Sequence, residues 1–233
     1  MKISNNNKLI QRNKKISQVV LYTALAMLVV GLIWSFSGAN ITQYTMAYII
    51  LIPAYILVQI SIYLANKWGR SPRPDEIIGQ SLKGLNDQYT LYNYNSGVPH
   101  LLVGPAGLWI IKPYHQSGQI TFNTDKNRFE QTGGANFIAK LFGQEGLTNI
   151  ERESKIALRD FDLFNKKMSI DIDVKPKVVN IFYSEKADVL AKNAPEATIH
   201  SDKLKDLIRS QAKLSPLKDE KINLIRKQLP DSN

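Results

Sequence analysis

An uninterrupted run without formal charge, from Ile16 to Asn66, constrains this chain more than any other feature. Its 51 positions contain no Asp, Glu, Lys or Arg. The run divides into two apolar stretches, residues 16–36 and 44–65, and a helix of about 20 residues spans the ~30 Å hydrocarbon core of a bilayer. Residues 37–42 between them have the composition of a turn. The run therefore predicts a two-helix transmembrane hairpin over residues 16–66.

The charges that flank this run predict its orientation. The chain has 30 basic and 20 acidic residues, a net charge of +10. Half of this excess lies in residues 1–15, which hold five Lys and Arg and no acid, and Lys67, Arg70 and Arg73 follow the second stretch. Basic flanks stay in the cytoplasm. We therefore expect a multi-pass protein of the cell's inner (plasma) membrane with both termini cytoplasmic, a basic tail at residues 1–15 and a linker at residues 67–73.

Two other interpretations of the run exist. A cleavable signal peptide also has a basic start, an apolar stretch and small residues near Ser35, but its apolar stretch is ~7–15 residues long. A buried hairpin in a soluble protein is the other interpretation. No Asp, Glu, Lys, Arg or His lies within the stretches, which argues against a transporter. Pro53 is expected to kink the second helix, and the small residues Ser61 and Ala65 are expected to pack the two helices together.

The remaining residues, 74–233, have the composition of a soluble domain. The chain has no cysteine, which excludes a disulfide framework, a thiolate zinc site and a thiol nucleophile. Its three histidines are far apart in sequence, so no metal centre and no cofactor are expected. No phosphate-binding glycine loop and no serine hydrolase motif is present either.

Alternating and helical apolar patterns predict an α/β domain with a mixed sheet and helices on its faces. The expected helices are residues 74–86, 148–167, 201–211 and 216–229. The expected strands are residues 89–94, 98–103, 108–112, 119–123, 127–131, 177–183 and 197–200, with 108–112 central because it is apolar throughout. Residues 133–146 form a glycine-rich connection.

The stretch from Glu76 to Gly118 resembles the nuclease-related domain (NERD) family. The shared pattern is a helix with Glu76 and a Leu-rich face, an aromatic strand, the hairpin Val-Pro-His-Leu-Leu-Val-Gly-Pro-Ala-Gly at residues 98–107, an apolar strand and a later glycine. The resemblance covers about 45 residues. It implies a PD-(D/E)xK-like α/β fold related to nucleases, and membrane helices beside such a domain fit the family.

The departures from the family pattern fall on its chemistry. Pro99 stands where the family has Asp, and Lys112 and Tyr114 stand where it has Glu and Lys; only Glu76 keeps a carboxylate. Mg²⁺ in such a site needs several carboxylate oxygens, so we expect no catalytic residues, no metal and no cleavage. Lys112, Tyr114 and His115 are instead candidates for binding a phosphate or an acidic group of a partner; the alternative is an ordinary strand end at the surface.

The sequence thus favours a membrane-anchored binding or scaffold module, with the lipid bilayer and a protein as its partners. A membrane-tethered nucleic-acid binder is one alternative, although residues 67–233 carry only 25 basic against 20 acidic residues and no basic stripe interleaved with aromatics. A metal-dependent nuclease whose site is rearranged around Glu76, Asp125 and Glu130 is the other. Two further pairs, Asp171 with Asp173 and His100 with His115, are expected to be a solvated loop and ordinary polar residues.

Overall fold

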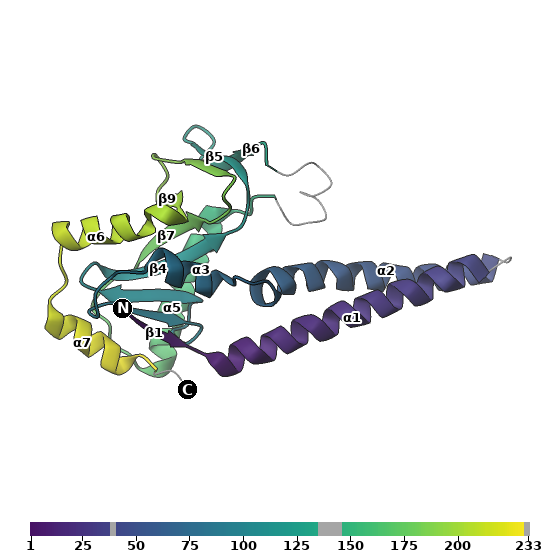
Figure 1. Ribbon diagram of the computed structural model, residues 1–233, viewed down its shortest axis with the longest axis horizontal. Coiled ribbons are helices and arrows are strands. Elements are labelled where there is room, and N and C mark those ends of the chain that lie inside the picture. Colours follow the sequence, from purple (N-terminus) through teal and green to yellow (C-terminus); the bar gives the residue numbers. More distant parts are fainter. Residues whose placement is uncertain (38–40, 135–145, 231–233) are drawn as a thin grey trace. The chain divides into compact units, whose positions relative to one another are not determined.

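The structure is a computed structural model that describes residues 1–37, 41–134 and 146–230 (Figure 1). The chain forms two compact units. One contains residues 8–73, and the other contains residues 1–7 together with the chain from residue 74 onward. The division between the two units falls between residues 73 and 74. Of the expected connections, residues 38–40 and 135–145 lie outside the described residues, whereas residue 37 ends α1 and residues 41 and 42 belong to α2.

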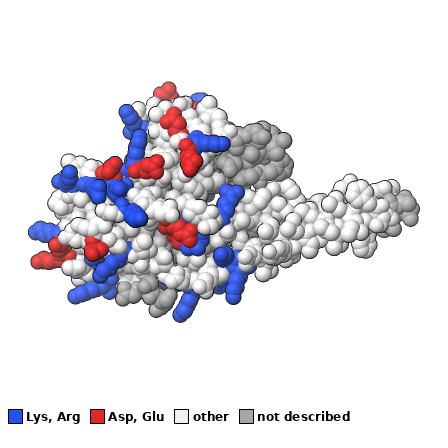
Figure 2. Space-filling model, viewed as in Figure 1, with Lys and Arg blue, Asp and Glu red and all other residues white. Residues whose placement is uncertain are grey.

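The unit of residues 8–73 is a helical hairpin. It contains α1 (Asn7–Ser37), α2 (Ile41–Leu64) and a short π-helix, η1 (Ala65–Gly69). Both long helices are long and apolar enough to cross a membrane, with mean hydropathies of 2.3 and 2.0 over their most apolar windows. In Figure 2 the rod of the hairpin is white, without charged side chains. The two expected apolar helices are therefore present, and α2 continues through Pro53.

Small residues line the contact between α1 and α2. The buried positions recur every seven residues, so they fall on one face of each helix: Ser17, Ala24 and Gly31 on α1, and Ala47, Ala54 and Ser61 on α2. A Cβ atom at Gly31 would lie 2.6 Å from Leu51 Cδ2, so the backbones approach closely there. Packing through Ser61 was expected, but Ala65 belongs to η1 and the spacing is seven residues rather than four.

Six strands form a mixed sheet in the order β1-β2-β3-β4-β7-β9. β2, β3 and β4 are antiparallel neighbours, whereas β1 pairs with β2, and β7 with both β4 and β9, in parallel. The strands are β1 (Lys2–Asn5), β2 (Thr90–Asn93), β3 (His100–Gly104), β4 (Gly107–Tyr114), β7 (Lys177–Phe182) and β9 (Ala197–His200). The expected mixed sheet is confirmed, with β4 inside it.

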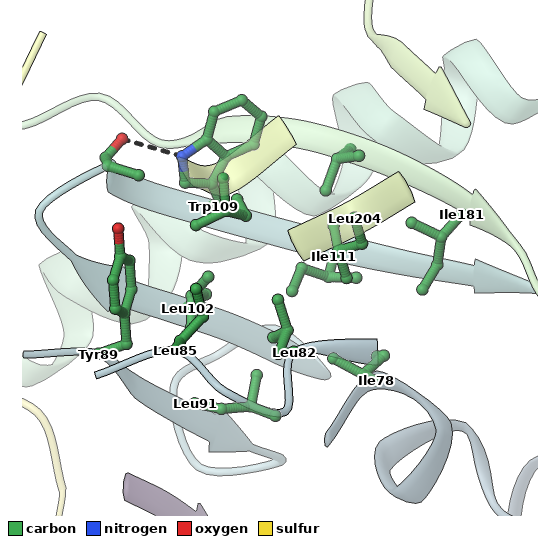
Figure 3. Close-up of a cluster of buried hydrophobic side chains, with 13 residues drawn as sticks. Ile78, Leu82, Leu85, Tyr89, Leu91, Leu102, Trp109, Ile111, Ile181 and Leu204 are labelled. Carbon is green, nitrogen blue, oxygen red and sulfur yellow. Dashed lines mark hydrogen bonds between the residues drawn. The ribbon is translucent and has the colours of Figure 1, made fainter. Parts of the chain in front are cut away.

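Helices cover both faces of this sheet. α3 (Pro74–Ser81) and α6 (Leu204–Leu214) pack on one face, and α5 (Ile150–Met168) and α7 (Asp219–Gln228) pack on the other. Strand alternation divides β4 between them: Trp109 and Ile111 join the α3 side (Figure 3), while Leu108 and Ile110 join the α5 side. The Trp109 indole donates a 2.9 Å hydrogen bond to the Ala106 carbonyl in the β3–β4 turn.

A smaller sheet of three strands lies beside the first, in the order β6-β5-β8. It contains β5 (Gly118–Asn123), β6 (Arg128–Thr132) and β8 (Ala187–Leu190). The expected pairing of residues 119–123 with 127–131 is confirmed, but in a separate sheet, and β8 was not expected. A third core cluster of Tyr114, Ile120, Ile150 and Phe182 joins β5 to the ends of β4 and β7.

The start of the chain is not a tail. Residues 1–15 were expected to be a basic tail, but residues 2–5 form β1 and the helix α1 begins at Asn7. Lys2 N donates to Tyr89 O at 2.9 Å, and Asn6 N donates to Asn93 O at 3.0 Å. The physical reason for the error is that an edge strand of four residues has no apolar periodicity of its own; a distant strand supplies its hydrogen bonds.

Several element boundaries also differ from expectation. α3 ends at Ser81 instead of residue 86, and Gly84 follows with a φ of 91° that suits only glycine well. The linker is shorter because residues 67–69 belong to η1. The last two helices begin three residues later than expected, after a 3-10 turn at Ser201–Lys203 and after Pro216, respectively.

Candidate functional site

The carboxyl end of β4 carries the residues that the sequence singled out. Lys112 and Tyr114 have the same parity along β4 as Leu108 and Ile110, which pack on the α5 side of the sheet. Because successive side chains of a strand alternate between faces, Lys112 and Tyr114 also point to the α5 side. Both side chains therefore lie where a side chain of α5 can contact them at this end of the sheet.

The helix α5 presents Glu153 there. Asn149 caps the helix, its side chain accepting a 2.9 Å hydrogen bond from Arg152 N, and this fixes where the first turn begins. Ile150 and Ser154 are buried in this turn, and the Ser154 hydroxyl lies 3.4 Å from Asn180 Oδ1 on β7. With these neighbours fixed against the sheet, Glu153 is held over the end of β4.

Lys112, Tyr114 and Glu153 form what we call the strand-end cluster. Lys112 Nζ lies 2.9 Å from Glu153 Oε2, and the Tyr114 hydroxyl donates to the same oxygen at 3.0 Å. The side chains of Lys112 and Glu153 are 18% and 36% exposed. The Tyr114 ring is buried and stacks on Phe182 with ring centroids 5.2 Å apart. The cluster is thus an ion pair with a phenol as second donor.

The environment fixes the protonation of the cluster. Burial alone would raise the pKa of Glu153, but hydrogen bonds from Lys112, Thr148 and Tyr114 and the Lys112 charge lower this pKa overall. Burial, together with the charge and hydrogen bond of Glu153, raises the pKa of Tyr114 far above its ordinary value. Near neutral pH the cluster therefore contains an ionised carboxylate and a protonated phenol, which is the arrangement that makes both hydrogen bonds possible.

Two more carboxylates lie near the cluster. Burial and the negative charge of Glu151 raise the pKa of Glu196, while Lys155 opposes this shift. Glu196 also contributes to the raised pKa of Tyr114, so it lies within electrostatic range of the cluster. Glu151 accepts a long hydrogen bond of 3.4 Å from Asn127 in the β5–β6 turn. The end of the sheet is therefore richer in acids than the strand sequence alone indicates.

The other residues singled out in the sequence lie on elements other than β4 and α5. Pro99 precedes β3, and its carbonyl accepts a 2.8 Å hydrogen bond from Tyr94 N. Glu76 lies in the first turn of α3. His100 is 2% exposed, and its Nδ1 lies 2.8 Å from Asn93 Oδ1 on β2. His115 follows the end of β4, half-buried.

The acids considered for a rearranged site are dispersed. Glu130 lies on β6, with Arg128 at 3.2 Å and Lys126 at 3.6 Å, and Asp125 lies in the exposed β5–β6 turn. Asp171 and Asp173 lie in an exposed loop, and Asp173 lies 3.5 Å from Lys221. Among the residues that the structure describes, no three His, Asp or Glu side chains come together as a metal site would need.

This arrangement limits the chemistry available at the strand end. Glu153 already balances the charge of Lys112, so the lysine is not a free phosphate ligand. A Mg²⁺ ion at Glu153 would meet an ammonium group 2.9 Å from the carboxylate oxygen, and repulsion between the two cations opposes such binding. The cluster can exchange its internal ion pair for contacts to a polar partner, because the side chain of Glu153 is about one third exposed.

Sequence reasoning identified Lys112 and Tyr114 but missed Glu153. The residues of α5 were assigned to an amphipathic helix, and the position of that helix over β4 is a long-range contact. Two signals were available: Asn149 as a helix cap, and Glu153 in the first turn beside a buried face. They locate the carboxylate on the helix but not its partner.

Comparisons of the chain with protein-family models, with curated proteins and with solved structures gave no significant match. The resemblance to nuclease-related domains therefore depends on the residues of the β3–β4 hairpin and their neighbours alone.

Proposed function

We propose that this protein is anchored in the inner (plasma) membrane by α1 and α2 and displays its α/β domain in the cytoplasm as a non-catalytic binding or scaffold module. The domain is a degenerate relative of nuclease-related domains. It recognises a protein partner through the carboxyl end of β4, where the strand-end cluster lies.

The parallel pairing of β1 with β2 supports the first part of this proposal, the membrane anchoring with the domain in the cytoplasm. β1 precedes α1 and β2 follows α2, yet the two strands share hydrogen bonds across four residue pairs. Because strands do not pair across a bilayer, this pairing supports a topology in which both flanks of the inserted hairpin lie on one side of it. Two crossings satisfy this requirement, and the basic flanks favour the cytoplasmic side. Cleavage of α1 as a signal peptide would remove an edge strand from the folded domain.

Single-cysteine labelling tests this topology without background, because the chain has no cysteine. Gly38→Cys, in the connection between the helices, should react with a membrane-impermeant maleimide added to intact cells. Lys203→Cys, exposed on the domain, should react only after the cells are opened. Reaction of Lys203→Cys in intact cells would refute the cytoplasmic assignment.

The family resemblance and the strand-end cluster support the second part of the proposal, in which the domain is a non-catalytic module that binds a protein partner. The order of α3, β2, β3, a Gly-Pro-x-Gly turn and β4 agrees with the family pattern, while the family's carboxylates are replaced. What remains at the strand end is a partly exposed ion pair with a buried phenol as second donor, and we expect its exposed part to serve recognition. Cross-linking from a photoreactive residue at Lys155, which is exposed beside the cluster, should capture a cytoplasmic protein in the intact membrane. Unchanged capture in Lys112→Met/Glu153→Gln would refute this use of the cluster.

One observation favours a second candidate, a nuclease with a rearranged site. A glutamate and a lysine do meet at the end of β4, with the glutamate supplied by α5 instead of by the strand. If this pair worked as the family's Glu and Lys do, Mg²⁺-dependent cleavage of nucleic acid by the intact protein would be lost in Glu153→Gln. Absence of any cleavage by the unaltered protein argues against this candidate.

A further inference from the structure

Three cations form a stripe on the first turns of α1. Lys8, Arg12 and Lys15 are spaced i, i+4 and i+7, so they share one face of the helix. All three are exposed. The residues that α1 buries, Ile10 and Ser17, fall about 180° away around the axis at 100° per residue. The stripe thus faces away from the hairpin contact and ends where the uncharged run begins.

Two more cations lie at the same end of the hairpin. Gly69 in η1 faces Ser17 of α1, whose Oγ lies 3.5 Å from where a Cβ of Gly69 would be. Lys67 and Arg70 therefore lie at the level where the α1 stripe ends. Lys67 Nζ is 5.4 Å from the ring centroid of Trp68, which is itself 5% exposed. Tryptophan at such a position is typical of the membrane interface.

No acid balances this charge within the described residues. None of Lys8, Arg12, Lys15, Lys67 and Arg70 forms an ion pair there, and the chain contains no Asp or Glu before Asp75. Like charges at i, i+3 and i, i+4 destabilise a helix by a few tenths of a kcal/mol per pair. An anion bound along the stripe would remove this repulsion.

We propose that these five residues, the basic collar, bind the headgroups of anionic phospholipids in the cytoplasmic leaflet. The occupant follows from charge complementarity and position: the collar directly adjoins two apolar helices, and a headgroup phosphate lies at that depth beside any membrane-spanning hairpin. The inference rests on the proposed membrane anchoring but is independent of what the domain binds.

Brominated lipids test the collar on the full chain. The protein carrying Trp34→Phe is reconstituted in phosphatidylcholine vesicles, which leaves Trp68 as the reporter at the collar; Trp109 in the domain core adds a constant background. Quenching by dibrominated phosphatidylglycerol is compared with quenching by dibrominated phosphatidylcholine. Their ratio gives the preference for the anionic headgroup.

The expected preference is several-fold for the unaltered collar and falls close to one in Lys8→Gln/Arg12→Gln/Lys15→Gln. A basic residue near an anionic surface contributes on the order of five-fold, so the loss should be large and should also occur at high salt. A matched variant, Lys192→Gln/Lys203→Gln/Lys213→Gln, removes the same charge from exposed positions on the domain and should keep the preference.

Three results would overturn the inference, and they differ in what else they affect. A ratio near one in the inserted, unaltered protein removes the lipid site and leaves the anchoring intact. If the detergent-solubilised protein binds duplex DNA through the collar and shows no lipid preference, the ligand of the collar is nucleic acid and not lipid. Failure of the hairpin to resist alkaline extraction from membranes removes the anchoring and the collar together.

Discussion

The Asn93 side chain on β2 donates a 2.7 Å hydrogen bond to Asn5 Oδ1 on β1. Asn93 Oδ1 also contacts His100 Nδ1 at 2.8 Å, so a polar chain crosses three neighbouring strands. Asn93 is 1% exposed and His100 2% exposed. Buried hydrogen bonds of this kind are costly to break. The segment before the hairpin is therefore part of the fold that follows it.

Disrupting β1 should destabilise the α/β domain. Lys2 N and Asn6 N bond to β2, and in a parallel ladder the donors alternate, so Ser4 N also faces β2. Ser4→Pro removes this donor and the hydroxyl that accepts from Asn95 at 2.8 Å. We expect the free energy of unfolding to fall by about 2–4 kcal/mol, measured by denaturant titration with Trp109 fluorescence.

Ile3→Pro is the matched control. Its N–H faces the open edge of the sheet, and Ile3 is 50% exposed, so the loss should be about 1 kcal/mol or less. If neither substitution changes the free energy of unfolding, residues 1–6 do not contribute to the fold and are a tail, as the sequence predicted.

The hairpin contact predicts a specific cross-link. Because Ser17 Oγ lies 3.5 Å from the Cβ position of Gly69, Ser17→Cys/Gly69→Cys should form a disulfide readily on mild oxidation. Adding Ala24→Leu should slow the reaction at least several-fold, because Ala24 is 0% exposed in the contact and a larger side chain forces the helices apart. Gel mobility with and without reductant measures the yield.

Val29→Leu serves as the comparison for Ala24→Leu, since Val29 is 55% exposed on the outer surface of α1. It should leave the rate of disulfide formation unchanged. If both substitutions slow the reaction equally, the seven-residue pattern of small residues is not what holds α1 against α2.

Local patterns predicted much of the fold. The unbroken apolar run of residues 108–112 predicted a central strand, and β4 lies between β3 and β7 inside the six-stranded sheet. The uncharged run predicted the end of α1 and both ends of α2 to within about one turn, whereas α1 begins at Asn7 instead of residue 16. Such features depend on the chemistry of neighbouring residues, which a sequence displays directly. The place of the β5–β6 hairpin in a second sheet depends on pairing with distant β8, and no local pattern encodes it.

Only part of the candidate site was predicted, because its other part depends on a contact between residues that are distant in sequence. Lys112 and Tyr114 adjoin a recognisable hairpin, whereas Glu153 is 41 residues away from Lys112 along the chain. Its helix has an obvious amphipathic pattern, but the pattern says which face is buried, not which strand end lies beneath Glu153. β1 escaped prediction likewise, since its partner β2 is 88 residues further along the chain.

The pair Lys112–Glu153 should show a small coupling energy in a double-mutant cycle. With side chains 18% and 36% exposed, the pair is screened by solvent, so Lys112→Met and Glu153→Gln should couple by about 0.5–1 kcal/mol. The reference cycle uses Lys221→Met and Asp173→Asn, whose charges are 3.5 Å apart but 52% and 96% exposed; its coupling should be near zero. Equal coupling energies in the two cycles would contradict the conclusion that Lys112 and Glu153 interact more strongly than an exposed ion pair.

The lowered pKa of Glu153 predicts a pH dependence of stability. A carboxyl whose folded-state pKa lies below its ordinary value of 4.5 contributes stability that is present above that value. This contribution is lost as pH falls through the lower, folded-state pKa. Glu153→Gln should therefore flatten the decline in stability below about pH 4.5 and leave the shape above about pH 6 unchanged.

Glu196 should affect the pH dependence of stability in the opposite direction, because its pKa is raised and not lowered. Burial and the charge of Glu151 raise its pKa, so the folded state favours its protonated form and this group contributes stability that grows as pH falls through the folded-state pKa. Glu196→Gln should raise stability at neutral pH relative to the unaltered protein. Denaturant titrations at several pH values separate the two carboxylates; a steeper acid decline in Glu153→Gln would contradict the assignment.

The chain of residues 1–233 in detergent should not cut DNA or RNA with Mg²⁺ or Mn²⁺. Pro99 offers no side-chain ligand, and Lys112 stands where the resemblance to nuclease-related domains implies a carboxylate. Glu153 brings one carboxylate back, but its contacting oxygen is shared by Lys112 and Tyr114. A hard dication held by so few anionic oxygens would not remain bound without substrate.

The assay needs the whole chain, because a fragment of residues 67–233 lacks β1 and its lack of activity would say nothing about the site. Glu76→Ala should alter stability alone, since Glu76 lies in the first turn of α3, where a carboxylate favours the helix dipole. Cleavage that requires both a divalent metal and Glu76 would contradict this expectation and support a nuclease site of the kind that the resemblance implies. Cleavage that requires Glu153 but not Glu76 would instead establish the rearranged nuclease, with α5 as the source of its carboxylate.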